Sequence, residues 1–343
     1  KDMRDFDNDR EGGRNTYVNF AGIEISSRIM IFFSWFGFIL WIQALYMSDR
    51  FPDSIFAILC FLCILSVPIK DFSAPVQPTF QSDEKPKKEI LISTRSKFYK
   101  IRIVIVIPTY NETKSIETLL NNLLPKSSSD TAVIICDDSG ANLRGFYRDL
   151  CSRLEKKENR IIDLSFSEIK SGRGSAVIRG FAAGREKYPM AQFYIECDAD
   201  GSHQVTDILK VIDQDFALDF VIGSRYLPTS KIVGWPISRR VFSKVLNIII
   251  PKVLKLNTSD ATNGLRRYSR AAVDQILKAK MKTSGFIALS EVAMILKSYS
   301  INPLDVPIKF VNRQLGKSTV TGKEIWHSIA GLVTLLMHKY VRK

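Results

Sequence analysis

The fold is decided by residues 101–112, which read IRIVIVIPTYNE. Residues 101–107 are a short β-branched run of the kind found in strands that are buried on both faces of a parallel sheet. A polar turn follows, and an apolar repeat of helical period over about 113–124 predicts a helix. This strand–turn–helix unit indicates an α/β protein.

The same alternation continues toward the C-terminus. Strands are predicted at 131–136, 160–164, 193–197 and 219–224, and helices at about 145–157, 174–186 and 286–299. This order predicts a mostly parallel sheet with helices on both faces, in which ligands bind beyond the carboxyl ends of the strands. The polar clusters PTYNE, DDS, DAD and GSR each follow a predicted strand, so we expect the functional site at that edge.

Two carboxylates close the strand at 193–197. Asp198 and Asp200 stand two residues apart, a spacing at which they can share one divalent cation. Oxygen ligands in a chain with only three histidines suit Mg²⁺ or Mn²⁺, which usually also hold substrate phosphates. A solvated acidic turn is the alternative. A second acidic strand end, Asp137 and Asp138, favours a site.

A glycine-rich turn precedes the helix predicted at 174–186. Residues 170–176 read KSGRGSA, in which glycine permits a tight turn and the free N–H groups of a helix start favour a phosphate. The segment matches neither a P-loop nor a dinucleotide-binding fingerprint. A plain connecting turn therefore remains an alternative.

The N-terminal part has a different character. Residues 28–70 are predicted to form two transmembrane helices, between a basic tail at 1–27 and a linker at 71–98. Ile29–Met47 holds nineteen uncharged residues, enough for a helix of about 28 Å, whereas the second apolar run at 55–69 is short for a span. A buried helix pair is the alternative. The positive-inside rule puts both ends of the hairpin, and hence the catalytic domain, on the cytoplasmic face.

Composition excludes several classes of protein. The 343 residues carry a net charge of +14, with 45% hydrophobic and 24% charged residues, a globular balance that excludes global disorder and fibrous repeats. Five cysteines exclude a disulfide scaffold in a chain of this length. Lipid head groups beside the hairpin explain the basic excess, and since no nucleic-acid motif is present we expect no nucleic-acid partner.

Seven motifs in order carry a family resemblance. They read VIVIPTYNE, ICDDS, KSGRGSA, ECDADGSH, IGSRY, SDATNGLRRYSR and VPIKFVNRQLGKS. Together they resemble the family 2 glycosyltransferases of the GT-A fold, and most closely the polyprenyl (dolichyl) phosphate mannose synthases. The resemblance covers roughly 100–340. It implies a Rossmann-like GT-A domain at 99–320 with a mostly parallel sheet flanked by helices.

The resemblance also implies a site for a nucleotide-sugar donor. Its residues are Pro108, Tyr110, Glu112, Asp137, Asp138, Lys170, Asp198 and Asp200. The first three resemble the nucleotide-binding wall, the next pair would meet the base or ribose, and Lys170 would lie near the nucleotide. Asp198 and Asp200 resemble the metal ligands that neutralise the diphosphate. Some relatives offer a glutamine as a further metal ligand two residues beyond this pair, where this chain has Ser202. The next residue, His203, is either a site residue or a structural hydrogen-bonder.

Basic residues match the family's positions for a lipid phosphate. They are Arg225, Arg239, Arg240, Arg313 and Lys317. Arginine binds phosphate through a planar, bidentate fork, although ordinary solvated charge is the alternative for each residue. The residues expected to carry the reaction are Asp200, Arg225 and Arg313.

The resemblance implies the reaction as well. A hexose, with mannose favoured, is expected to pass with inversion from a nucleotide-sugar to a polyprenyl or dolichyl monophosphate. GDP-mannose is the favoured donor and a UDP-sugar the other option. A phosphate monoester has a second pKa of about 6, so the acceptor is largely dianionic at neutral pH and needs no general base.

Other readings stay open. A polyprenyl phosphate glucose synthase, a polysaccharide-extending family 2 enzyme and a non-catalytic membrane-bound nucleotide-binding scaffold are the alternatives in function. Residues 321–343 predict an amphipathic helix, either at the membrane surface or packed against the soluble domain.

Overall fold

The structure is a computed structural model. It describes residues 100–168, 170–279, 281–283, 285, 287–313, 331–332 and 334–335. The two predicted membrane spans, the tail and the linker lie outside these residues. Among the helices of the described residues, none is both long and apolar enough to cross a bilayer.

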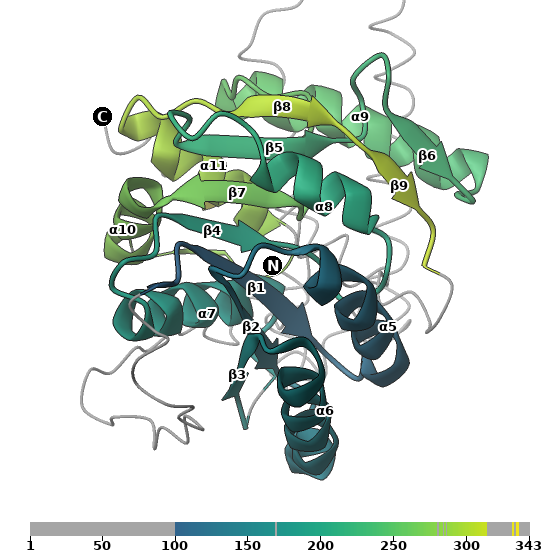
Figure 1. Cartoon of the computed structure of the whole chain (residues 1–343). Coiled ribbons are helices and arrows are strands. Elements are labelled where there is room, and N and C mark those ends of the chain that lie inside the picture. The colour runs from purple at the N-terminus through teal and green to yellow at the C-terminus, as the bar shows by residue number, and fades with distance from the viewer. Residues whose placement is uncertain are drawn as a thin grey trace, which may run out of the picture. The chain divides into compact units, whose positions relative to one another are not determined.

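Strands and helices alternate through most of the described chain (Figure 1). The strands are β1 (Ile103–Thr109), β2 (Thr131–Asp137), β3 (Ile161–Phe166), β4 (Phe193–Glu196), β5 (Phe220–Ser224), β6 (Lys231–Val233), β7 (Arg266–Ser269), β8 (Leu304–Pro307) and β9 (Lys309–Val311). The helices are α5 (Thr113–Leu123), α6 (Arg144–Glu158), α7 (Arg173–Lys187), α8 (Val205–Ile212), α9 (Ile237–Leu254), α10 (Arg270–Lys278) and α11 (Ile287–Ser298). Two short 3₁₀ helices, η3 (Leu124–Lys126) and η4 (Ala141–Leu143), follow α5 and β2.

Seven of these strands form one sheet in the order β3-β2-β1-β4-β7-β5-β8. Strand β1 pairs in parallel with β2 and β4, and β2 pairs in parallel with β3, as the sequence predicts. Strand β7 runs antiparallel to both of its neighbours, β4 and β5. The predicted α/β class with a mostly parallel sheet is therefore confirmed, with one reversed strand that the sequence did not predict.

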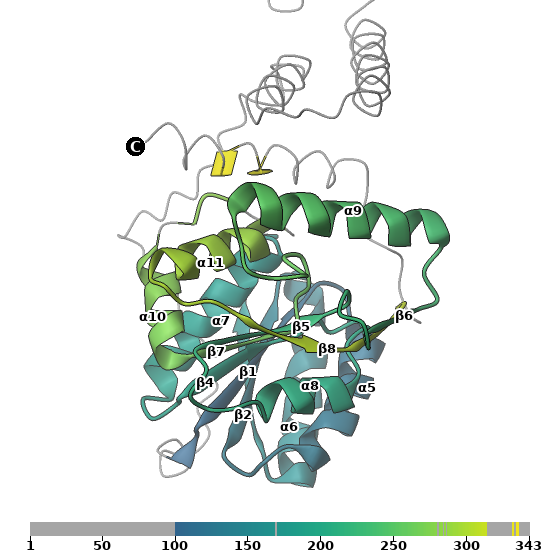
Figure 2. The same cartoon turned by 90° about the horizontal axis from the view of Figure 1, so that it is seen from above.

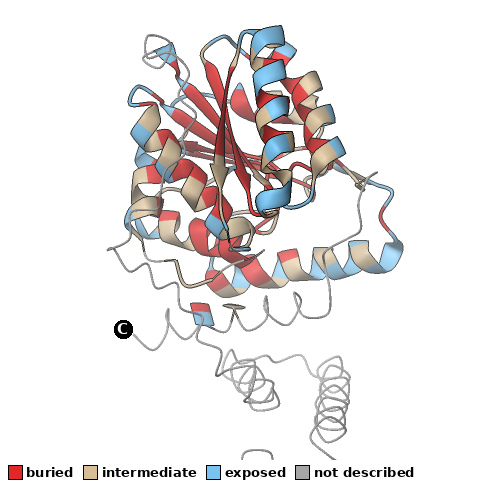
Figure 3. Ribbon diagram, turned by 90° about the horizontal axis from the view of Figure 1, so that it is seen from below, coloured by how far each residue is buried: buried red, intermediate tan, exposed pale blue. Residues whose placement is uncertain are grey.

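Alternate residues of β1 enter two separate cores. Val104 and Val106 pack with residues of α7, α10, α11 and α9, whereas Ile105 and Ile107 pack with residues of α5, α6 and α8. Figure 2 shows these two sets of helices on opposite faces of the sheet, and Figure 3 shows the strands buried between them. The period of two along a strand explains why an apolar run without polar alternation forms its centre.

A second, small sheet completes the region around the predicted site. Strand β6 pairs in parallel with β9, and an isolated antiparallel bridge joins His203 to Phe310 of β9. These pairings bring the segment after β4 and the segment before α9 together with β9, which lies 107 residues beyond His203 and 78 residues beyond Lys231 in the paired positions.

Part of the C-terminal segment is described. Leu335 is fully buried in the core that holds Ile287, and Leu332 packs against the same core. This short stretch is thus in contact with the α/β domain; the rest of 321–343 lies outside the described residues.

Candidate active site

The carboxyl ends of β1 and β2 carry the residues expected to meet the nucleotide. Pro108 pairs with Cys136 near the end of both strands, and Tyr110 follows as a partly exposed ring. The Lys170 Nζ lies 4.1 Å from the centre of that ring, a cation–π distance. The structure therefore brings Tyr110 and Lys170 together from segments sixty residues apart.

The two aspartates after β2 have different surroundings. Asp137 is buried and accepts hydrogen bonds from Thr109 Oγ1 over 2.9 Å and from the Ser139 backbone N–H over 3.2 Å. Asp138 accepts from the Ser171 backbone N–H and hydroxyl, each over 2.8 Å, and from Arg179 Nη2 over 2.8 Å. Asp138 thus fastens the glycine-rich turn before α7 to the end of β2.

Glu112 lies at the start of α5, where its carboxylate accepts a hydrogen bond from Ser115. This local contact keeps the glutamate at the helix N-terminus, next to the PTYNE turn. Negative charge is stabilised there by the free N–H groups and the helix dipole.

Asp198 meets a cation that the sequence did not indicate. Arg173, in the first turn of α7, donates from Nε to Asp198 Oδ1 over 2.8 Å and from Nη1 to Glu196 Oε2 over 3.1 Å. Its Nη2 donates to the Gly264 carbonyl over 3.1 Å. Burial alone would raise the pKa of Asp198, but the charge and the hydrogen bond of Arg173 are the main contributions that offset burial, so that pKa lies below its ordinary value.

Asp200 is paired with a predicted site residue. Its Oδ2 lies 3.3 Å from Arg313 Nη2, and its Oδ1 accepts from the Ser202 backbone N–H over 3.0 Å. The Ser202 hydroxyl is buried and has no hydrogen-bond partner among the described residues. A buried hydroxyl without a partner is costly, so this oxygen is suited to a ligand beside Asp200.

The hydrogen bonds of His203 favour the structural role, although its Nε2 also lies 4.0 Å from Asp198 Oδ2. Its Nδ1 accepts from the Asp198 backbone N–H over 3.1 Å, and its Nε2 lies 3.0 Å from Asn263 Oδ1. Because Nδ1 accepts, Nε2 carries the proton and donates to Asn263. The imidazole is buried and spans two loops, which is a structural role.

Arg225 is buried against a carboxylate and several rings. Its Nε and Nη2 donate to the two oxygens of Asp260, each over 2.7 Å, and Nη2 also donates to Thr262 Oγ1. The guanidinium carbon lies 5.6 Å from the Trp235 ring centre and 5.3 Å from that of Phe310. Asp260 therefore compensates the charge of Arg225 and fixes the position of its buried guanidinium.

Arg239 has no such compensation. Its guanidinium lies over the Trp235 ring at 4.2 Å, and Nη1 approaches Asn312 Oδ1 at 3.4 Å. Within the described ranges no carboxylate is at ion-pair distance from it. Burial, then the charges of Arg313 and Arg225, lower the pKa of Arg239, with Asp200 partly opposing them. Three arginines therefore converge near Asp200 with more positive than negative charge.

The two remaining basic residues differ. Arg240 is exposed on α9, and its Nη2 donates to the Ile232 carbonyl over 2.9 Å. Of the neighbouring pair, Arg239 is thus the one that the structure groups with Arg225 and Arg313. Lys317 lies outside the described residues.

The carboxylates that follow β4 are open to solvent, as a divalent-cation site shared with a substrate requires. The side chains of Asp198 and Asp200 are 27% and 14% exposed, so each is reachable from solvent. In the part of the chain that the structure describes, no three His, Cys, Asp or Glu side chains gather as a closed metal site. Mg²⁺ commonly binds through one or two carboxylates plus substrate phosphates, and this open pair of carboxylates fits that mode.

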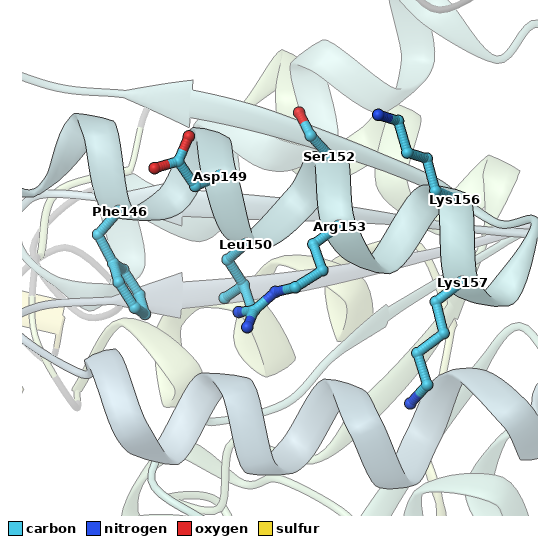
Figure 4. A pocket seen from close by; sticks show the side chains of 7 residues that line it. All are labelled: Phe146, Asp149, Leu150, Ser152, Arg153, Lys156 and Lys157. Atoms are coloured by element: carbon cyan, nitrogen blue, oxygen red, sulfur yellow. The ribbon is translucent and has the colours of Figure 1, made fainter.

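A hollow of about 840 Å³ lies elsewhere, along α6 (Figure 4). Its lining residues are Phe146, Asp149, Leu150, Ser152, Arg153, Lys156 and Lys157. Arg153 and Lys157 there contact Glu117 and Asn121 of α5. All of its lining residues belong to α6, and none of the residues expected at the site is among them.

Several contributors to the site escaped prediction. Arg173 and Glu196 lie within quoted motifs, but no local pattern shows that they pair. Arg266, fully buried, donates to the carbonyls of Ala261, Asn263 and Leu289 and so holds the loop that carries Asp260. The motif SDATNGLRRYSR had marked this loop in the sequence, but not its contacts with Arg266.

Comparisons with known proteins identify the family of this chain. The family model for glycosyl transferase family 2 matches residues 104–277, about half of the chain. An undecaprenyl-phosphate mannosyltransferase of Micrococcus luteus is 30% identical over 236 residues, covering 68% of this chain and 93% of that protein. A polyprenol monophosphomannose synthase of Mycolicibacterium smegmatis is 28% identical over 226 residues, covering 65% and 83%.

A solved structure was also matched. Glucosyl-3-phosphoglycerate synthase from Mycobacterium tuberculosis aligns with a TM-score of 0.46 at 14% identity, over 70% of this chain and 78% of that one.

Proposed function

This chain belongs to glycosyl transferase family 2 and is a glycosyltransferase, and from that premise we propose that it transfers a hexose, with mannose favoured, from a nucleotide-sugar to a polyprenyl monophosphate. The names of the two bacterial relatives support the acceptor and the sugar. GDP-mannose is the favoured donor. A glucose-transferring or polysaccharide-extending enzyme remains the alternative, to be separated by the experiment below.

The observation that carries the proposal is the excess of positive charge beside Asp200. Arg239 is half-buried, lies over Trp235 and is repelled by Arg225 and Arg313. A dianionic phosphate relieves this repulsion, and guanidinium groups bind it through bidentate, charge-assisted hydrogen bonds. We therefore assign Arg239 and Arg313 to the acceptor phosphate, and Arg225 to holding their surroundings through Asp260. Lys317 stays a candidate for the same phosphate.

The donor is assigned to the neighbouring strand ends. Tyr110 and Lys170 form an exposed ring and cation beside the carboxyl end of β1, suited to a nucleotide base and its phosphates. Pro108 and Glu112 lie on either side of Tyr110 in the chain. Asp137 accepts a hydrogen bond from Ser139, and Asp138 accepts one from Ser171, so both aspartates hold the adjacent loops in place. Asp198 and Asp200 would hold Mg²⁺ or Mn²⁺, which when bound neutralises the diphosphate leaving group.

These assignments give the proposed reaction the following course. An oxygen of the acceptor phosphate attacks the anomeric carbon, a new C–O bond forms on one face, and the bond to the nucleoside diphosphate breaks on the other, which inverts the configuration. The acceptor is dianionic near neutral pH and requires no protein base. Arg239 and Arg313 orient its oxygen, Arg173 keeps Asp198 charged and in place, and the burial of Trp235 and Phe310 limits water.

A lipid acceptor requires the site to lie beside a bilayer. We propose that the two apolar segments within 28–70 anchor the chain as transmembrane helices, with the glycosyltransferase domain on the cytoplasmic face. The absence of acidic residues from Ile29–Met47 supports a span of that length.

A donor and acceptor panel tests the function. The full chain in membranes is incubated with labelled GDP-mannose, UDP-glucose or UDP-N-acetylglucosamine, with and without polyprenyl phosphate and Mn²⁺. A mild-acid-labile labelled lipid that requires both GDP-mannose and polyprenyl phosphate is the expected result. Labelled lipid from UDP-glucose alone supports the glucose-transferring alternative, and labelled polymer without lipid product contradicts the phosphate acceptor.

A further inference from the structure

A series of buried hydrogen bonds connects the carboxyl ends of β4 and β5. The Asp198 backbone N–H donates to His203 Nδ1 over 3.1 Å, and His203 Nε2 donates to Asn263 Oδ1 over 3.0 Å. The Asn263 side-chain amide donates in turn to the Gly223 carbonyl. His203 and Asn263 are each 2% exposed, so solvent does not compete for these bonds. We call this series, from Asp198 through His203 and Asn263 to Gly223, the cross-strand link.

The reversed strand β7 explains why side chains make this connection. The sheet places β7 between β4 and β5, so the backbones of these two strands do not pair with each other (Figure 1). Because β7 runs antiparallel to both, its first residue, Arg266, lies opposite Glu196 of β4 and Ile222 of β5. The loop that leads into β7 therefore passes the carboxyl ends of both strands, and Asn263 belongs to that loop.

The two ends of the cross-strand link belong to different parts of the site. Asp198 lies on the proposed donor side, where β1 pairs directly with both β2 and β4. Gly223 lies two residues before Arg225, whose backbone N–H and Nε both donate to Asp260 Oδ2. Asp260 and Asn263 are in the same loop. The link therefore joins the donor strands to the loop that holds Arg225 on the acceptor side.

The orientation of the His203 ring is fixed as well. Its centre lies 5.4 Å from the centre of the Phe310 ring, at an interplanar angle of 78°, which is an edge contact. Phe310 is itself buried, packs edge-on against Trp235 and lies 5.3 Å from the guanidinium carbon of Arg225. A turn of the His203 ring would therefore displace the aromatic rings that surround Arg225.

Glycosyl transfer depends on the distance between the donor and acceptor sides. The reacting atoms must approach to about 3–3.5 Å, and a misplacement of about 1 Å can cost about a hundredfold in rate. We propose that His203 and Asn263 are positioning residues that set the distance between the donor side at Asp198 and the acceptor side at Arg225. This inference rests on the proposed function for the identity of the two sides, whereas the cross-strand link stands on the hydrogen bonds alone.

His203→Gln in the full chain tests the proposal. A glutamine amide still donates toward Asn263, but no acceptor remains at the position of Nδ1, so the Asp198 N–H loses its partner. We expect kcat for transfer to a short-chain polyprenyl phosphate in detergent to fall about tenfold or more, with KM within about twofold of wild type. The fall is expected because only the distance between the two sides changes.

Two measurements on the donor side separate positioning from loss of structure. Calorimetric titration with GDP and Mn²⁺ should give His203→Gln an affinity within about twofold of wild type, because β1, β2 and β4 pair without the link. Release of GDP from GDP-mannose without acceptor, where water takes the sugar, should change as little. A fall in GDP release or in GDP–Mn²⁺ affinity as large as the fall in lipid transfer overturns the proposal.

Ser290→Ala is the matched control. The Ser290 hydroxyl is fully buried and donates to the Ala261 carbonyl of the same loop over 3.0 Å, and that carbonyl keeps a hydrogen bond from Arg266 when the serine is lost. The variant removes a buried hydrogen bond from the loop and leaves the cross-strand link intact, so its ratio of lipid transfer to GDP release should equal that of wild type. An equal fall of this ratio in Ser290→Ala and His203→Gln would show a general effect of the loop and refute the positioning role.

Asn263→Ala breaks the cross-strand link at its other end. It should lower the ratio of lipid transfer to GDP release in the same direction as His203→Gln, and a wild-type ratio in a folded Asn263→Ala protein refutes the proposal. This variant also decides the question if His203→Gln does not fold.

The position of the His203 ring proton needs neither variant. The chain has three histidines, so His327→Gln with His338→Gln leaves His203 as the only one. Nitrogen-15 NMR of this histidine-labelled protein should find the ring proton on Nε2 and none on Nδ1. A proton on Nδ1 overturns the link and the proposal with it. If the wild-type protein releases GDP but forms no polyprenyl product, the proposed function fails, while the ring proton still decides whether the link exists.

Discussion

Arg173 donates a hydrogen bond from Nε to Oδ1 of Asp198 over 2.8 Å, and its Nη1 reaches Glu196 Oε2 at 3.1 Å. One guanidinium from the start of α7 thus compensates two carboxylates at the end of β4. Glu196 is almost fully buried and also accepts a hydrogen bond from Tyr268 over 2.6 Å. Arg173 therefore compensates Glu196 and Asp198, whereas Arg313 pairs with Asp200.

Replacing Arg173 is expected to destabilise the fold. Arg173→Met removes the nearer of the two cations from buried Glu196 and leaves Arg266, whose Nε lies 3.9 Å from Glu196 Oε1. Breaking a buried ion pair costs up to about 3–5 kcal/mol. Chemical denaturation of the full chain measures the free energy of unfolding. Adding Glu196→Gln to Arg173→Met removes the uncompensated charge and should recover much of the loss. A double variant as unstable as the single one contradicts the assigned pairing.

Gly264→Ala tests how tightly Arg173 is seated. A Cβ at Gly264 would lie 2.0 Å from Arg173 Nη2 and 3.1 Å from Asp198 Oδ1, so the guanidinium must move. We expect weaker Mn²⁺ binding by titration together with lower transfer activity. Gly145→Ala is the matched control, because a Cβ there meets no atom within 4 Å, and in helix α6 it should be neutral or stabilising by up to about 1 kcal/mol. Equal Mn²⁺ affinity in both variants contradicts the seating argument.

Arg239 and Arg240 are neighbours with different expected effects. Arg239→Gln removes a cation that converges on Asp200, so we expect a rise of roughly tenfold or more in KM for a short-chain polyprenyl phosphate in detergent, where a charge-assisted pair is worth about 1.5–3 kcal/mol. Arg240→Gln removes an exposed side chain bonded to the Ile232 carbonyl and should leave that KM nearly unchanged. A larger rise in KM for Arg240→Gln than for Arg239→Gln would contradict this assignment and show that Arg240 binds the phosphate.

The buried thiols should resist alkylation. Burial raises the pKa of the Cys136 thiol to about 12, and it also raises the pKa values of the Cys151 and Cys197 thiols. At pH 8 these groups are protonated and enclosed in the folded protein, whereas in the unfolded chain a cysteine titrates near pH 8.5. Peptide mass spectrometry after iodoacetamide treatment should find the three unmodified in the native protein and modified in urea. Rapid native alkylation of Cys136 contradicts its burial.

The sequence predicted the strands best where burial on both faces leaves a distinct pattern. The runs that became β1 and β2 were located to within two residues of their ends, and the alternation of elements predicted the parallel pairing. Strand β7 was missed because it contains Arg266 and Arg267, which look exposed in sequence. Both are fully buried, and their charge is satisfied by backbone carbonyls that only the folded chain brings together.

The site residues, too, were predictable where the signal is local in the sequence and not where it depends on distant contacts. Asp198 and Asp200 could be proposed from two carboxylates after one strand, because that signal is local. The pairing of Arg173 with Asp198 and of Arg313 with Asp200 joins residues 25 and 113 positions apart, and no local pattern predicts such contacts.

The central claim is that Asp200 is required for transfer of mannose to polyprenyl phosphate. The most direct test compares the lipid product formed by the full chain and by its Asp200→Asn variant. The control is Asp149→Asn, on the surface of α6. Membranes receive GDP-mannose, polyprenyl phosphate and Mn²⁺, and mass spectrometry quantifies mannosyl phosphoryl polyprenol. The wild-type and Asp149→Asn proteins should form it, and Asp200→Asn should form at least about a hundredfold less while its melting temperature stays close to wild type. Undiminished product from a folded Asp200→Asn variant, or no mannosyl lipid from the wild type, would contradict the account.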